Sequence, residues 1–75
     1  IISYNLPKDS HVNISIFDVL GRKVKTLTNQ HTKAGKNKVQ WNGKNDQGKL
    51  LAGGIYIYKI ISGGYNQSKK MILVK

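Results

Sequence analysis

The segment Ile55-Tyr-Ile-Tyr-Lys-Ile-Ile-Ser62 decides the fold, because its side chains alternate with the two-residue period of an extended strand. One face carries Tyr56, Tyr58 and Ile60, and the other carries Ile55, Ile57, Lys59 and Ile61. Since the Lys59 ammonium needs water, we expect the tyrosine face to line the core. The buried tyrosine hydroxyls then need hydrogen-bond partners near the rim of that core. On the opposite face, Ile57 and Ile61 are expected to be partly exposed and to offer a contact surface.

Four other segments show the same alternation or a short apolar run, and we expect strands at residues 2–6, 12–16, 39–41 and 71–74. Turn residues stand between them, at 18–21, 42–43, 45–48 and 63–64. Residues 29–37 are polar and are expected to form a longer connection. No segment has the pattern of an amphipathic helix. In all we expect six to seven short strands, of which these five are the clearest. This number predicts an all-β fold, a small antiparallel β-sandwich of the immunoglobulin or fibronectin type III kind.

Two aromatic residues are expected to close one end of the sandwich. Tyr56 stands near the start of the penultimate strand, where immunoglobulin-like sandwiches place the residue of their tyrosine corner. Trp41 follows a short strand and is expected to plug the end of the same core.

The chain is short and strongly basic. Its 75 residues are expected to form one domain, 1–75, with little volume for a deep cleft. Thirteen Lys and Arg residues oppose three acidic ones, which gives a net charge of +10. The cations are spread over nearly every loop and strand, so we interpret them as a solvated surface rather than as a nucleic-acid site. An acidic glycan or lipid partner is a lesser alternative, and no apolar run is long enough to span a membrane.

Catalytic, cofactor-binding and metal-ligating residues are not expected. The groups that such sites use are few: Asp9, Asp18, Asp46, His11, His31 and no cysteine. Two of the three aspartates stand at turn positions, and two histidines without a third ligand make a poor zinc site. Residues 42–48 have some of the oxygen ligands of a calcium loop. However, Lys44 occupies a ligand position and the chain has no Glu, so we expect only turns there and no enzyme activity.

The order of short motifs resembles a known family over nearly the whole chain. The motifs are Ile2-Ser-Tyr-Asn-Leu-Pro7, Val12-Asn-Ile-Ser-Ile-Phe-Asp-Val-Leu-Gly-Arg22, Ala34-Gly35, Trp41-Asn-Gly43, Asn45-Asp-Gln-Gly48, Gly53-Gly-Ile-Tyr-Ile-Tyr58 and Lys70-Met-Ile-Leu-Val-Lys75. They are similar to the immunoglobulin-like domain of the flagellar hook-capping protein. They equally resemble the C-terminal sorting domains of proteins secreted by the type IX (Por) system.

The resemblance implies the positions of the family motifs: Asp18, Gly21 and Arg22 in a turn, Gly54 and Tyr56 in a Gly-x-Tyr element, and Lys70 at the start of the last strand. Asn42 departs from the pattern, since hook-cap-like members usually carry Asp before Gly. The resemblance also implies that the domain is the C-terminal part of a larger secreted protein of a Gram-negative-type bacterium. It would direct that cargo to the cell surface or the medium.

The implied partners are the outer-membrane secretion machinery or surface-attachment proteins, together with the upstream domain of the same chain. The expected recognition strand consists of Lys69, Lys70, Met71, Ile72, Leu73, Val74 and Lys75. If this strand lies at a sheet edge, its backbone groups could extend a sheet of the receptor. Its lysines would limit unwanted pairing and attract an acidic face.

Two other function classes stay open. One is a structural or interaction module that packs against its own chain, self-associates, or builds a fibre or surface array, and exposed Ile57 and Ile61 suit it. The other is carbohydrate binding, which needs a planar aromatic strip on one face. With six aromatic residues, mostly assigned to the core, the second class is the weaker one.

Overall fold

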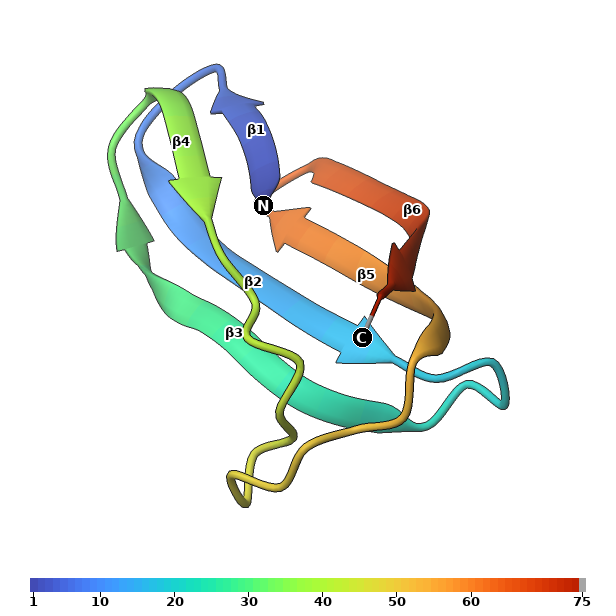
Figure 1. Ribbon diagram of the computed structural model, residues 1–75. Helices are drawn as coiled ribbons and strands as arrows, with labels where there is room; N and C mark the ends of the chain where they lie inside the picture. The colour runs from blue at the N-terminus through green and yellow to red at the C-terminus, as the bar shows by residue number, and fades with distance from the viewer. Residues whose placement is uncertain (75) are drawn as a thin grey trace.

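The computed structural model describes residues 1–74 and contains six strands (Figure 1). They are β1 (Ile2–Leu6), β2 (Ser10–Phe17), β3 (Lys23–Thr32), β4 (Gly35–Val39), β5 (Gly54–Ser62) and β6 (Tyr65–Leu73). Lys75, the last residue of the expected recognition strand, lies outside the described residues. Within residues 1–74 there is no helix that could cross a membrane.

The strands form two antiparallel sheets of unequal size. The larger sheet has the order β3-β2-β5-β6, and the smaller one pairs β1 with β4. Figure 1 shows β1 and β4 lying across one face of the larger sheet. This arrangement confirms the predicted all-β, immunoglobulin-like antiparallel sandwich, with six strands in the described part of the chain.

The core lies between the two sheets. Its buried hydrophobic residues are Ile2, Tyr4, Leu6, Val12, Ile14, Ile16, Tyr56, Tyr58 and Ile60. The expected orientation of β5 is confirmed, because its two tyrosines and Ile60 are buried while Lys59 is exposed. The face of β5 that lies in the core is thus set by free energy. Burying the Lys59 ammonium would be costly, whereas burying Tyr56, Tyr58 and Ile60 is favourable.

The two expected aromatic residues close one end of this core. The Tyr56 hydroxyl donates a hydrogen bond to the Ala52 carbonyl at 2.7 Å, which confirms that it finds a partner at the rim. The Trp41 ring meets the Tyr56 ring edge to face, with centroids 5.2 Å apart and planes inclined by 72°. Trp41 is half-buried, and its indole N–H donates to the Lys44 carbonyl at 2.9 Å.

The expectation of a long connection at residues 29–37 is wrong. Residues 29–32 continue β3, and residues 35–37 begin β4, so only residues 33–34 connect the two strands. The polar composition is compatible with strands because β3 is an edge strand, and Asn29, Gln30 and His31 on it are exposed. Polar side chains at such positions cost nothing in burial, so they do not exclude a strand.

The limits of β4 and β6 also differ from the expected ones. β4 ends at Val39, which pairs with Ile2, so Gln40 and Trp41 lie beyond the strand. The run at residues 71–74 is the end of a longer strand, β6, and Val74 lies outside it. Only alternate residues of this run face the core. Ile72 is therefore 71% exposed, while Met71 and Leu73 are half-buried.

Candidate interaction site

The motif Asp18, Gly21 and Arg22 builds the turn between β2 and β3. Backbone N–H groups of Leu20 and Arg22 both donate to the Asp18 carboxylate at 2.9 Å, and the Arg22 Nε donates to its second oxygen at 2.7 Å. Gly21 donates its N–H to the Asp18 carbonyl and has a φ of 83°, which favours glycine. These three residues therefore fix a turn, and their contacts lie within it.

The Asp18 carboxylate is held in its charged form. The pKa of Asp18 is lowered below its ordinary value, chiefly by the hydrogen bond from the backbone N–H of Arg22. The Arg22 guanidinium and the Leu20 N–H lower it further, whereas burial raises it by less than the first hydrogen bond lowers it. The Asp18 carboxylate therefore stabilises the turn through the hydrogen bonds that it accepts from Leu20 and Arg22.

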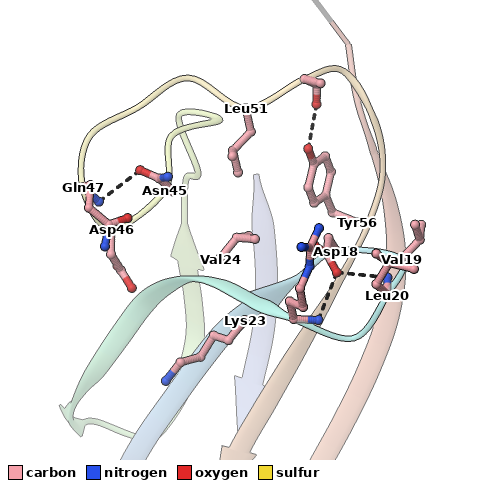
Figure 2. A pocket seen from close by; sticks show the side chains of 12 residues that line it. Asp18, Val19, Leu20, Lys23, Val24, Asn45, Asp46, Gln47, Leu51 and Tyr56 are labelled. Atoms are coloured by element: carbon pink, nitrogen blue, oxygen red, sulfur yellow. Dashed lines mark hydrogen bonds and ion pairs between the residues drawn. The ribbon is translucent and has the colours of Figure 1, made fainter.

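A second loop, residues 42–51, faces this turn across an open cleft of about 550 Å³ (Figure 2). Asn45 Oδ1 accepts the N–H groups of Gln47 and Lys49, at 3.0 and 2.9 Å. Asp46 accepts the Thr26 N–H at 3.1 Å and donates its own N–H to the Val24 carbonyl. The loop thereby covers the beginning of the β3 edge, and its polar atoms are occupied by backbone groups.

These contacts confirm turn chemistry at residues 42–48, where a calcium loop was the alternative. The side-chain oxygens of Asn42, Asn45 and Asp46 all accept backbone N–H groups. Within residues 1–74 no group of three or more His, Asp or Glu side chains could hold a metal ion. His11 and His31 are cross-strand neighbours on β2 and β3.

The other family positions lie on β5 and β6. Gly54 begins β5, and Tyr56 makes the rim contact with Ala52 described above. Lys70 is exposed and stands opposite Ile57. In antiparallel strands directly opposed residues share a face, so Lys70 belongs to the outer face of the larger sheet.

An apolar cluster lies on that same outer face, at the end where β5 begins. Ile55 stands opposite Ile72, and Ile57 stands opposite Phe17. Ile55 is 44% exposed and Ile72 is 71% exposed, while the other two are half-buried. We call Phe17, Ile55, Ile57 and Ile72 the outer apolar patch. The predicted partial exposure of Ile57 and Ile61 is confirmed, but Ile61, 49% exposed, lies two cross-strand rows away from the patch.

Two lysines border the outer apolar patch. Lys70 is the cross-strand neighbour of Ile57, and the Lys59 ammonium lies 5.5 Å from the centre of the Phe17 ring. This distance is within the range of a cation–π interaction. The patch is therefore apolar at its centre and positive at its margin.

The expected recognition strand is an edge strand in the structure. β6 pairs only with β5 among the described residues, so its far side is free to pair. Lys69 and Lys70 are both exposed but point to opposite faces, because Lys69 stands opposite the buried Tyr58. Ile72 and Val74 are exposed, and Met71 and Leu73 face inward.

In a comparison with protein families, the model of the FlgD Ig-like domain matches residues 2–64. The chain belongs to the FlgD Ig-like domain family. No curated protein and no solved structure matches it. The family agrees with the hook-capping part of the resemblance and covers β1 to β5 with the β5–β6 turn. No finding supports the type IX sorting part of that resemblance.

Two members of the outer apolar patch of this FlgD Ig-like domain were missed in the sequence. Ile72 was assigned to a continuous apolar strand, and Phe17 was not assigned to a face. The signal was nevertheless present for Ile72, since it stands two residues after the solvated Lys70 and so shares its face. For Phe17 the signal was present too, because it follows Ile14 and Ile16 in strict alternation and so points to the opposite face of β2.

Proposed function

We propose that this FlgD Ig-like domain is a non-catalytic structural module that holds a neighbouring protein through its outer apolar patch. The exposure of Ile55 and Ile72 side by side on a strand pair carries this proposal. Isolated exposed apolar residues are common, whereas adjoining ones on the same face of a sheet favour contact with another protein. The family suggests a setting such as flagellar hook assembly.

The chemistry of the partner follows from the margin of the patch. Lys59 and Lys70 flank the four apolar residues, and neither forms an ion pair within residues 1–74. A partner surface with an apolar centre and acidic residues around it would bury the patch and neutralise both lysines. A second copy of this chain fits poorly, because each copy carries a net charge of +10.

Site-specific photo-crosslinking in the native host tests this proposal. A photoreactive amino acid at position 72 should give one discrete protein adduct, and the Ile55→Asp change should abolish it. The control places the same amino acid at Gln30, which is exposed on β3, the strand at the other edge of the larger sheet. An equally strong adduct from position 30, or an adduct from position 72 that survives Ile55→Asp, would refute the proposed surface.

Type IX sorting is a second candidate, favoured by one specific observation. Within residues 1–74, β6 is an edge strand nine residues long that pairs only with β5, and strand addition to a receptor sheet needs such an edge. The test is export of a folded reporter fused ahead of Ile1 in a host with the type IX machinery, with and without residues 66–75. Export that disappears on truncation, while the truncated fusion stays soluble in the periplasm, supports sorting. Retention of both fusions beside an exported cargo excludes it.

A further inference from the structure

The smaller sheet is one strand short of the usual sandwich. Seven-stranded immunoglobulin sandwiches pair a sheet of four strands with a sheet of three. Here the larger sheet has four strands and the smaller sheet has two. Within residues 1–74, β1 pairs only with β4, so the backbone groups along its second edge have no strand partner. Figure 1 shows β1 between β4 and β6, with this second edge toward β6.

The inner face of β6 forms the floor beside this edge. Cross-strand pairing places Tyr65, Met71 and Leu73 on the face that carries the core. All three are only half-buried. Lys69 shares their face, as the neighbour of buried Tyr58, and is nevertheless exposed. An exposed lysine on the inner face of a sandwich means that no strand covers it there.

Open space is present at both ends of β1. At its beginning, a cleft of about 250 Å³ is lined by Ile2, Met71 and Leu73 among others. Beyond its end, a cleft of about 420 Å³ is lined by Pro7, Tyr65 and Ser62 among others. We call the strip along the free edge of β1, from the first cleft to the second, the β1 slot.

A buried polar atom points to an absent partner at one end of the β1 slot. Ser62 is 4% exposed, and its hydroxyl has no hydrogen-bond partner within the described residues. Buried hydroxyl groups are nearly always satisfied, so an orphaned one needs an explanation. Because Ser62 lines the second cleft, a polar backbone group entering there could satisfy it.

We propose that the β1 slot binds an extended acidic segment of a partner protein, which pairs with β1 as the third strand of the smaller sheet. Its inward side chains are apolar and cover Met71, Leu73 and Tyr65. Its outward side chains are acidic, because Lys36 and Lys38 of β4 are exposed on the outer surface of this sheet. Lys69 adds positive charge on the inner face of β6, between Tyr65 and Met71, which line the two clefts. A second copy of this basic chain is a poor occupant on the same electrostatic grounds.

This surface differs from the outer apolar patch. The slot uses the inner face of β6 and the edge of β1, whereas the patch uses the outer face of β5 and β6. The two proposals therefore fail independently.

The probe is the synthetic peptide acetyl-(Glu-Val)3-Glu-amide, titrated into the ¹⁵N,¹³C-labelled domain and followed by NMR. We expect saturable shifts at the amides of Ser3 and Asn5 and at the Met71 methyl group. Replacing the central Val of the peptide by Pro removes an amide hydrogen and should abolish binding. The peptide acetyl-(Lys-Val)3-Lys-amide should not bind either.

Two neighbouring lysines provide a matched pair of variants. Lys69→Glu reverses a charge on the inner face of β6 and should weaken binding about ten-fold, whereas Lys70→Glu makes the same change on the outer face and should weaken it less than about two-fold. No saturable shift, equal weakening by both variants, or shifts confined to the free edge of β6 would overturn the proposal. Concentration-dependent dimers of the free domain with shifts at the β1 amides would assign the slot to a second copy, which also overturns it.

Discussion

Replacing Tyr56 by Phe tests whether the rim hydrogen bond stabilises the sandwich. The change removes the hydroxyl that donates to the Ala52 carbonyl at 2.7 Å and keeps the ring that packs against Trp41. Ala52 is exposed, so water will hydrate its carbonyl in the variant. The loss should therefore be the net value of one hydrogen bond, about 1 kcal/mol, rather than the larger cost of an orphaned buried group. For a domain of this size that lowers Tm by about 4–8 °C.

Urea unfolding followed by the fluorescence of the single tryptophan measures this free energy, because Trp41 contacts the altered residue. The matched control is Tyr58→Phe. Tyr58 is as buried as Tyr56, at 8% exposure each, but its hydroxyl makes no hydrogen bond to protein within residues 1–74. We expect the control to cost less than about 0.5 kcal/mol. Equal costs for the two variants would show that the contact with Ala52 does not stabilise the fold.

Two further changes test the turns and the close packing around them. Asp18→Asn should be less stable than the unchanged protein at pH 7, because the lowered pKa of Asp18 gives stability that is present above its ordinary pKa. The difference should shrink as pH falls below that ordinary pKa and through the lower pKa of the folded protein. A difference in urea unfolding that does not change with pH contradicts the role of the Arg22 contacts. Gly43→Ala should cost about 1–2 kcal/mol for its φ of 79°. Gly48→Ala is its control in thermal unfolding, since Gly48 has a φ of 81° and open space around it. The new Cβ at Gly43 would lie 3.3 Å from Leu73 Cδ1, so a larger loss than at Gly48 shows that Leu73 is held in place, and equal losses show that it moves aside.

The sequence predicts the fold best where one side chain forces the orientation of a strand. In β5 the solvated Lys59 orients the whole strand, and the buried tyrosines follow. At β3 no such constraint exists, because an edge strand with exposed Asn29, Gln30 and His31 has the composition of a loop. These residues form a strand because they pair with β2, and their composition alone does not predict it.

The candidate surfaces could be predicted only in part, because they depend on which strands pair. The alternation of β5 predicts the exposure of Ile57, but the patch needs the register that sets Ile72 opposite Ile55. The β1 slot needs more still. The slot exists because, within residues 1–74, β1 pairs only with β4. The sequences of residues 2–6 and 35–39 do not predict that the other edge of β1 has no strand beside it.

The adjoining lysines of β6 show why charge alone is a poor guide to the function of this domain. Lys69 and Lys70 are adjacent in the chain, and both are exposed. Their partners across the strand pair are the buried Tyr58 and the outer-face Ile57, so one ammonium group borders the β1 slot and the other borders the outer apolar patch. A variant that changes both lysines would weaken two independent contacts at once. Single changes, by contrast, assign an acidic partner to one face or the other, because the net charge changes equally in both.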